Sequence, residues 1–289
     1  MKLLVDLKSI ENIDKYIADG FIISSDIYST HNDKCFSFEE MKLINNYTNK
    51  NNKLLIINID RIIEEEELDN VKNYIDNLLT LNVDYFIYGD FAILKYFKDL
   101  NLTSKLIYDP KTMITNYYEA DFHNRYNSLV AINNELTLDE INNIIKAKNV
   151  VMEVYGFHQM FYSRRQLLSN YSKFKKEDRN LINQELRIVE EKRDNEYPIF
   201  ESKNGTFIYT SFIYCLFKEL KELDELKFIR INTSFIEEAK ILKIIEIYSQ
   251  FLKDFSRADE LYEELKLIDN RIDSGFLYKG SVILKEGVK

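Results

Sequence analysis

The sequence predicts an α/β protein in which strands and helices alternate and close into a (β/α)8 TIM-like barrel. Short runs of β-branched and aromatic residues alternate along the chain with longer stretches of helical periodicity, and there are eight such runs. Strict alternation of this kind is typical of a parallel sheet, and eight is the number of strands that closes a (β/α)8 barrel. A doubly wound open sheet is the alternative architecture.

The eight expected strands are short apolar runs such as KLLVDL, KLLIINI and LKFIRINT. They cover residues 2–7, 21–26, 53–59, 83–90, 104–109, 128–133, 149–156 and 226–233.

Seven stretches with helical periodicity follow strands of this series. They cover residues 9–20, 37–51, 64–82, 91–101, 115–127, 136–148 and 235–255. In one of them Thr137 is expected to cap the helix, because Glu140 follows it at the spacing of a capping box.

Residues 156–225 separate the seventh strand from the eighth, so the sequence predicts an insertion after the seventh strand. In a barrel this insertion lies at the C-terminal rim, where barrel enzymes place their sites. Residues 197–210 predict a hairpin with Asn204–Gly205 as its turn. We therefore expect one barrel domain over residues 1–255, followed by a helical tail over residues 256–289.

Composition and charge restrict the classes of function. The net charge of −9 argues against a surface that binds nucleic acid everywhere, so any polyanion site must be a local basic patch. The two cysteines are too few for a disulfide framework or for a metal or iron–sulfur site made of cysteine alone. We expect no signal peptide and no membrane span, because Asp6 and Lys8 interrupt the first apolar run and no later run approaches roughly 18 residues. A cytoplasmic protein is the interpretation.

Polar residues at the ends of the expected strands should face the mouth of the barrel. They are Asp6, Ser24 to Asp26, Asn58, Gly89–Asp90, Asp109–Lys111, Asn133, Glu153, Arg230 and Asn232. Among them Asn58, Asp90 and Arg230 are predicted to bind substrate. The alternative role for each is helix capping or hydrogen bonding within a loop.

The segment EVYGFHQMFYSRRQLLSNY leaves the seventh strand and carries the predicted catalytic groups. Glu153 is the candidate acid–base group or carboxylate anchor, and an ion pair with Arg165 is its alternative role. His158 is the candidate proton-transfer group, and a packed histidine at the rim is the alternative.

The same segment carries groups suited to binding RNA. Arg164 or Arg165 could grip a phosphate or carboxylate through two parallel hydrogen bonds. Tyr155, Tyr162 and Tyr171 offer ring faces on which an unstacked base could lie. Residues 163–193 hold nine cations and five anions, which also fits a solvated helix with internal ion pairs.

Several catalytic motifs are missing from the chain. It contains no HExxH and no GxSxG, and no glycine-rich loop that would cradle phosphates. These absences argue against the common metallopeptidase and serine-hydrolase mechanisms and against use of a nucleoside triphosphate or dinucleotide.

Three passages resemble the collagenase-like peptidase family U-32, whose fold is a barrel. They are EVYGFHQMFYSRRQLLSNY, RDNEYPIFESKNGTFIYTS, and the pair YGDFAILKYF and TNYYEADF, the last typical of short Gram-positive-type members. The resemblance implies RNA modification, above all prephenate-dependent formation of 5-hydroxyuridine at the tRNA wobble position. It therefore implies a tRNA partner and prephenate as a cosubstrate. The family name implies a peptidase as the alternative.

Many members of that family hold an iron–sulfur cluster with four cysteines, two of them within the signature. Gln159 and Gln166 stand at those two positions here, and an amide cannot supply the thiolate that a cluster needs. The resemblance therefore implies no iron–sulfur cluster in this chain. We also expect no metal site, because the three histidines lie in the loops of different strands.

Short members without a cluster often accompany a longer, cysteine-bearing relative. The resemblance thus implies a paralogue of the same family as a partner, with this chain active alone, active as a subunit, or present as a non-catalytic subunit. The family's lysine–acid pair on the last strand appears here as Arg230 and Asn232, which removes a carboxylate from the mouth.

Overall fold

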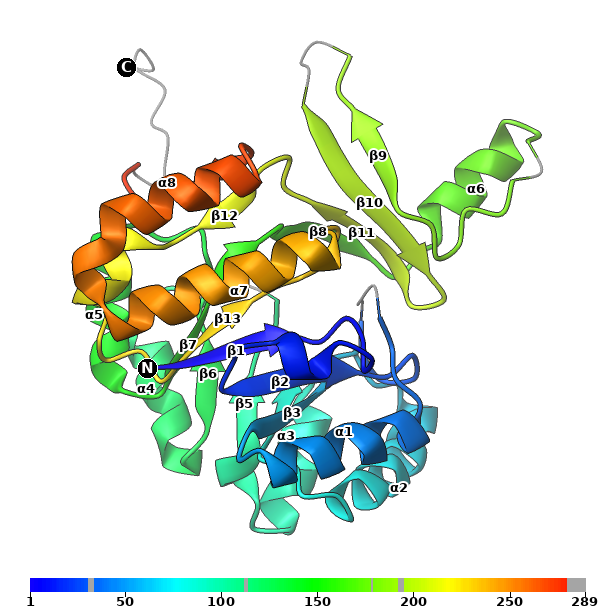
Figure 1. The fold of residues 1–289 in the computed structure, drawn as a ribbon. Coiled ribbons are helices and arrows are strands. Elements are labelled where there is room, and N and C mark those ends of the chain that lie inside the picture. Colours follow the sequence, from blue (N-terminus) through cyan, green and yellow to red (C-terminus); the bar gives the residue numbers. More distant parts are fainter. Residues whose placement is uncertain (31–33, 112–113, 178, 192–194, 280–289) are drawn as a thin grey trace, which may run out of the picture.

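The computed structural model describes residues 1–30, 34–111, 114–177, 179–191 and 195–279, and it contains a closed barrel (Figure 1). Eight parallel strands follow one another around it, and β13 pairs with both β1 and β7 to close the ring. Their bounds are β1 Lys2–Asp6, β2 Gly20–Ser24, β3 Leu54–Ile59, β4 Tyr85–Tyr88, β5 Leu106–Tyr108, β6 Leu129–Ala131, β7 Val150–Gly156 and β13 Phe228–Ile231. The predicted (β/α)8 fold is confirmed, and the open-sheet alternative is wrong.

The interior of the barrel is filled by one apolar side chain from each strand. These eight residues are Leu4, Ile22, Ile56, Ile87, Ile107, Leu129, Val151 and Phe228. Their strand neighbours, such as Leu3, Val5, Ile57 and Met152, belong to a second and larger core outside the ring. Because side chains alternate between the two faces of a strand, residues two positions beyond the apolar layer also point into the barrel.

Helices surround the barrel and cover the outer core (Figure 1). They are α1 Phe38–Lys50, α2 Leu68–Leu79, α3 Phe91–Asp99, α4 Tyr117–Phe122, α5 Leu138–Ile144, α7 Glu238–Lys253 and α8 Ala258–Ile268. Short 3-10 turns occupy Ile13–Lys15, Glu65–Glu67, Thr103–Lys105, His123–Tyr126, Ile145–Ala147, Lys218–Glu222 and Phe255–Arg257. The predicted capping box of Thr137 and Glu140 is confirmed at the start of α5.

The helix predicted over residues 9–20 is wrong, because only the 3-10 turn Ile13–Lys15 forms there. Three side chains of this segment bind the carboxylate of Glu238 at the start of α7. Ser9 Oγ and Asn12 Nδ2 each donate over 2.7 Å, and Tyr16 Oη donates over 2.6 Å. This tertiary anchor outweighs the helical pattern of the sequence.

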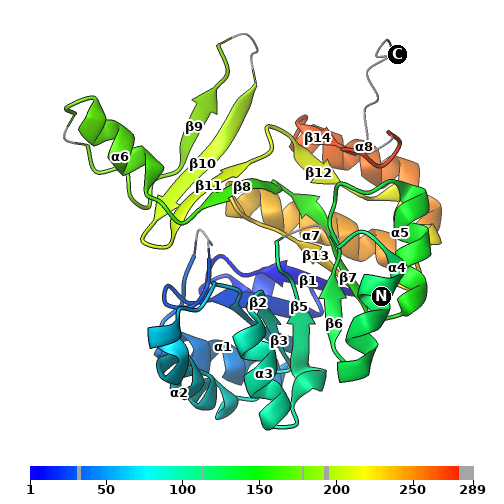
Figure 2. The ribbon, with the colours of Figure 1, turned by 180° about the vertical axis from the view of Figure 1, so that it is seen from behind.

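The insertion forms an arm that projects from the barrel, and Figure 2 shows it from behind with α6 at its far end. We use "arm" for β8 Gln159–Ser163, α6 Leu167–Phe174, β9 Leu186–Val189, β10 Glu196–Ser202 and β11 Gly205–Tyr209. Its four strands form an antiparallel sheet in the order β8-β11-β10-β9. The hairpin turn lies one residue earlier than predicted: Ser202 pairs with Gly205, so Lys203 and Asn204 make the loop.

Two further strands extend the barrel sheet beyond β7. β12 Ile213–Cys215 pairs antiparallel with β7, and β14 Ile272–Asp273 pairs with β12. The C-terminal α8 lies beside α7 (Figure 1). Among the described residues, no helix combines the length and apolar character needed to cross a membrane.

Candidate functional site

The C-terminal end of the barrel holds a layer of polar side chains above the apolar interior. Each member stands two residues after an apolar-layer residue of its own strand, so both point inward. We call this set the polar layer: Asp6, Ser24, Asn58, Asp109, Glu153 and Arg230. The corresponding residue directly after β4 is Gly89, where a Cβ would stand 3.0 Å from the main-chain oxygen of Asp60.

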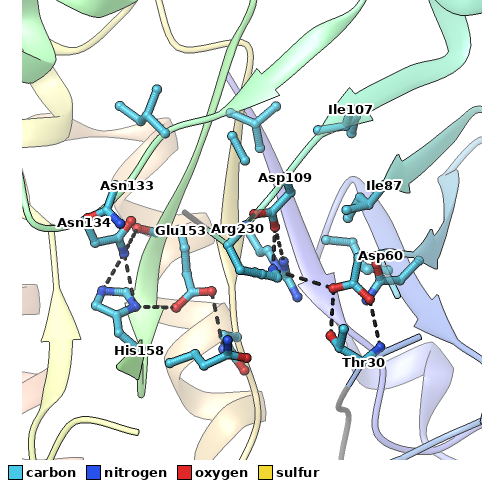
Figure 3. A pocket seen from close by; sticks show the side chains of 18 of the residues that line it. Thr30, Asp60, Ile87, Ile107, Asp109, Asn133, Asn134, Glu153, His158 and Arg230 are labelled. Carbon is cyan, nitrogen blue, oxygen red and sulfur yellow. Dashed lines mark hydrogen bonds and ion pairs between the residues drawn. The ribbon is translucent and has the colours of Figure 1, made fainter. Parts of the chain in front are cut away.

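A cavity of about 130 Å³ opens above this layer, and we call it the mouth cavity (Figure 3). Its floor is apolar and includes Leu4, Ile22, Ile87 and Ile107. The acidic, basic and histidine residues that line it are Asp60, Asp109, Lys111, Glu135, Glu153, His158 and Arg230. Four carboxyl groups against one lysine and one arginine make the lining acidic, so this cavity by itself does not suit a chain of phosphates.

Glu153 and His158 form a close pair at one wall of the cavity (Figure 3). His158 Nδ1 lies 2.8 Å from Glu153 Oε1, and both side chains are less than one-fifth exposed. Burial alone would raise the pKa of Glu153, but the His158 ring, Arg230 and Lys111 outweigh it and lower that pKa. The pair is therefore an ionised carboxylate that orients an imidazole, an arrangement used in general acid–base catalysis. The alternative pairing of Glu153 with Arg165 is not formed.

Asn134 holds the other side of the His158 ring. Its Nδ2 donates to the main-chain oxygen of Glu153 over 2.9 Å and also contacts Nε2 of His158. The His158 ring is thus held between the carboxylate of Glu153 at Nδ1 and the side-chain amide of Asn134 at Nε2. The ring centroid also lies 4.6 Å from that of buried Tyr214, which limits rotation of the imidazole.

Arg230 stands at the centre of a buried network of charges. Its Nε and Nη2 donate to the two carboxylate oxygens of Asp6 over 3.0 and 2.8 Å, and its Nη1 lies 3.6 Å from Asp109. Burial would lower the pKa of Arg230, but the carboxylates of Asp6 and Glu153 raise it. Arg230 lines the cavity as predicted for a substrate-binding residue, yet its charge is already matched within the protein.

Lys111 and Asp60 continue this network along the opposite wall. Lys111 Nζ contacts Asp109 and lies 3.9 Å from Asp60, and Asp60 accepts from the main-chain N and Oγ1 of Thr30 (Figure 3). Burial would lower the pKa of Lys111, but Asp109 raises it. Charges of alternating sign thus run from Asp6 through Arg230, Asp109 and Lys111 to Asp60, and such a network fixes the shape of the cavity wall.

Asn58 also lines the cavity and is only 2% exposed. Ser29 Oγ donates to its main-chain oxygen over 2.7 Å. Its side-chain oxygen Oδ1 is buried and accepts no hydrogen bond from any described residue. A buried acceptor without a donor is uncommon in folded proteins and needs a physical explanation.

Two other predicted binding residues lie outside the cavity. Tyr155 is fully buried, where its ring makes an edge contact with Tyr248, so it cannot stack on a base in this structure. Asp90 caps α3, since Oδ1 accepts from the main-chain N of Ala92 and Oδ2 from that of Ile63. For Asp90 the structure therefore has the capping role that was the alternative.

The remaining predicted binding residues belong to the arm. Arg164, Arg165 and Tyr171 are exposed, and Arg164 forms an ion pair with Glu64 of the barrel. Tyr162 is half-buried, stacked on Phe207 at 4.8 Å, and its hydroxyl donates to the main-chain oxygen of Asn204. None of these four lines the mouth cavity.

The two glutamines of the signature are separated by the length of β8. Gln159 begins this strand and lines the mouth cavity, whereas Gln166 precedes α6 in the arm. Over the described residues, no group of three or more histidine, cysteine or acidic side chains is arranged to hold a metal ion.

Sequence reasoning missed two residues of the site. Asp60 follows Asn58 at the same two-residue spacing that makes the polar layer, so the alternation of the strand could have indicated it. Asn134 lies in the loop after β6 and reaches His158 only through the folding of that loop, for which the sequence has no signal.

Comparison with known proteins identifies the family. The family model for peptidase family U32 matches residues 6–284. The chain belongs to this family. As a U32 protein it is 25% identical over 285 residues to tRNA hydroxylation protein P2 of Bacillus subtilis (strain 168), with 92% of each chain covered. The predicted family is confirmed.

Two further relatives are more distant. The U32 chain is 23% identical over 299 residues to the uncharacterized protease MJ0090 of Methanocaldococcus jannaschii, which covers 95% of this chain and 71% of the relative. The solved structure of the U32 peptidase Mk0906 aligns with 80% of this chain and 92% of its own, at 10% identity and a TM-score of 0.48.

Proposed function

We propose that this U32 protein acts in RNA modification, and specifically in prephenate-dependent 5-hydroxylation of the wobble uridine of tRNA in the cytoplasm. The observation that carries the proposal is the match to a tRNA hydroxylation protein over 92% of both chains. A match of this extent covers the barrel, the arm and the polar layer together, so the similarity is not confined to one short motif.

The mouth cavity supplies groups for the chemical step. Replacing the hydrogen at C5 of uracil by a hydroxyl group is a two-electron oxidation, so a co-reactant must supply the oxygen and accept two electrons while a proton leaves C5. Glu153 and His158 form the paired carboxylate and imidazole that can take up this proton. Prephenate carries carboxylates, and the cations that line the cavity are Lys111 and Arg230. Both are paired with aspartates, so binding of prephenate there requires one of these pairs to open.

The arm supplies groups for holding the RNA. Residues 163–193 have a charge of +4 in a chain of −9, which leaves −13 for the remainder. Leu167, Tyr171 and Phe174 follow one another at helical spacing and form an exposed stripe along α6, where the ring of Phe174 is 80% exposed. Exposed rings beside cations are the usual surface for unpaired nucleotides, because rings stack on bases and cations hold phosphates. Arg164, Arg165 and Tyr171 belong to this surface.

Two alternatives make different demands on the chain. A cysteine-bearing paralogue could carry the chemistry, with this chain holding the RNA as a non-catalytic subunit. A peptidase that used Cys215 as its nucleophile would need the thiolate, and burial raises the pKa of this thiol to about 12, which keeps it protonated. We favour the hydroxylation function because it uses both the acid–base pair and the basic arm.

The test is mass spectrometry of tRNA nucleosides from a strain that lacks this gene and any redundant paralogue. We expect loss of 5-hydroxyuridine derivatives and recovery when the wild-type gene is restored. Unchanged levels would contradict the proposal. Casein turnover by the purified protein that Glu153→Gln abolishes would favour the peptidase. Co-purification of a cysteine-bearing relative, with Glu153→Gln still restoring the modification, would favour the non-catalytic subunit.

A further inference from the structure

The unpaired amide oxygen of Asn58 points to a ligand in the mouth cavity. Asn58 lines the cavity and is only 2% exposed. Its Oδ1 accepts no hydrogen bond from the described residues. Leaving a buried acceptor unpaired costs on the order of 1–3 kcal/mol, and a molecule bound in the cavity that the acceptor lines would remove this cost. Such a molecule must present a hydrogen-bond donor to Oδ1.

The position of Asn58 in the barrel determines which residues lie across the cavity from it. The closed order is β1, β2, β3, β4, β5, β6, β7 and β13, so four steps separate β3 from β7 in either direction. Asn58 on β3 and Glu153 on β7 therefore stand on opposite walls of the cavity. A flat ligand that touches Asn58 with one edge turns its other edge toward Glu153 and His158.

We propose that Asn58 is the specificity-determining residue of the site and binds the N3–O2 edge of a uracil base turned out of the RNA. This inference rests on the proposed function, which makes uridine the substrate. Asn58 Oδ1 would accept from N3–H, and its Nδ2 would donate to O2, the pairing that a side-chain amide offers to a base edge. In the six-membered ring C5 and C6 lie opposite C2 and N3, so C5 faces Glu153 and His158.

This edge also separates uracil from cytosine. Cytosine has an acceptor at N3 and an acceptor at O2, so either orientation of the Asn58 amide leaves its oxygen against an acceptor. Uracil has a donor at N3 beside the acceptor at O2, and one orientation satisfies both. The amide therefore accepts uracil and rejects cytosine without any further neighbour that holds its orientation.

The experiment measures binding of the full-length protein to three anticodon stem-loops that differ only at the wobble base. They carry uridine, cytidine or 3-methyluridine, and the methyl group of the last removes the N3–H donor without altering the protein. We expect the uridine stem-loop to bind about 10- to 100-fold more tightly than the other two. Asn58→Leu, which keeps the size but removes both polar atoms, should reduce this preference to less than about twofold. Asn77→Leu, at an exposed amide on α2, is the matched control and should keep it.

Each outcome decides the inference. Equal binding of all three RNAs by the wild type overturns the role of Asn58 and leaves the RNA function standing. A preference that persists in folded Asn58→Leu also overturns it. If that variant does not fold, the comparison of uridine with 3-methyluridine on the wild type decides. Binding of none of the three RNAs overturns the RNA function and this inference with it.

Discussion

The mouth cavity and the arm differ in how their charged side chains are paired and exposed. In the cavity nearly every charge has a partner of opposite sign, as in the pairing of Arg230 with Asp6 and Asp109. On the arm Lys173 and Lys176 are exposed and form no ion pair within the described part of the chain, and the rings of Tyr171 and Phe174 face solvent. Paired buried charges hold a fixed geometry, whereas exposed cations and rings remain available to a large partner.

This difference in charge pairing indicates which region carries out each step of the proposed function. The mouth cavity cannot neutralise a nucleic-acid backbone, because four carboxyl groups line it against one lysine and one arginine. The arm can hold a backbone, but its predicted binding residues do not line the cavity. Substitution of the acid–base pair should therefore change the chemical step, whereas substitution of the cations of the arm should change the affinity for the RNA backbone.

The largest expected effect is on the stability of the barrel. Asp6→Asn removes the negative charge opposite buried Arg230, and breaking a buried pair in this way costs about 3–5 kcal/mol. Chemical denaturation monitored by circular dichroism measures the change. Asp69→Asn, which breaks the exposed pair with Lys72 on α2, is the control and should leave the denaturation midpoint unchanged. Equal effects of the two substitutions would mean that the network at the mouth does not stabilise the fold.

The next effect is on chemistry alone. Glu153→Gln keeps the size of the side chain but removes the charge that orients His158, so we expect at least about a 100-fold loss of uridine hydroxylation. Affinity for the anticodon stem-loop should change less than about threefold, because the arm remains intact. Hydroxylation is measured by quantifying 5-hydroxyuridine in tRNA from a complemented deletion strain. Affinity for the stem-loop is measured by fluorescence anisotropy. A variant with normal hydroxylation would remove Glu153 from the mechanism.

A smaller effect is expected on affinity alone. Changing Lys173, Lys175 and Lys176 together to glutamate should weaken RNA binding by about 30-fold and reduce the salt dependence of log K by about two, since single-stranded contacts contribute about 0.7 each. Binding titrations at several salt concentrations measure both. The matched control changes Lys95, Lys98 and Lys146, exposed lysines on the barrel helices and the turn after α5, to glutamate. If both triple variants lose affinity alike, net charge and not the arm is responsible.

The smallest effect is expected from a single ring. Phe174→Ala removes a side chain that is 80% exposed, so the free energy of unfolding should change by less than about 0.5 kcal/mol. RNA affinity should fall up to about tenfold, as for the loss of one stacked base. Leu267→Ala, at an 88% exposed side chain on α8, should change neither quantity. A melting temperature lowered by Phe174→Ala would indicate that the ring packs within the protein.

Particular residues mark how far the site could be predicted. Glu153, His158, Asn58 and Arg230 were within reach, because strand alternation and the end of each strand place them at the mouth. Tyr155 was predicted to stack on a base and is buried in the outer core, because the pairing of β7 with β13 shifts by one residue between Glu153 and Tyr155 and breaks the inward–outward alternation. Asn134 was not predictable, since its contact with His158 joins two loops 24 residues apart.

The sequence by itself determined the barrel, the insertion after the seventh strand and the apolar and polar layers. These features follow from local periodicity, which each strand and helix carries in its own residues. Tertiary structure alone decided that residues 9–20 bind Glu238 instead of forming a helix, that Glu153 pairs with His158, and that the arginines of the signature lie outside the cavity. Those outcomes depend on which distant side chains meet after folding, and no local pattern encodes the distance between them.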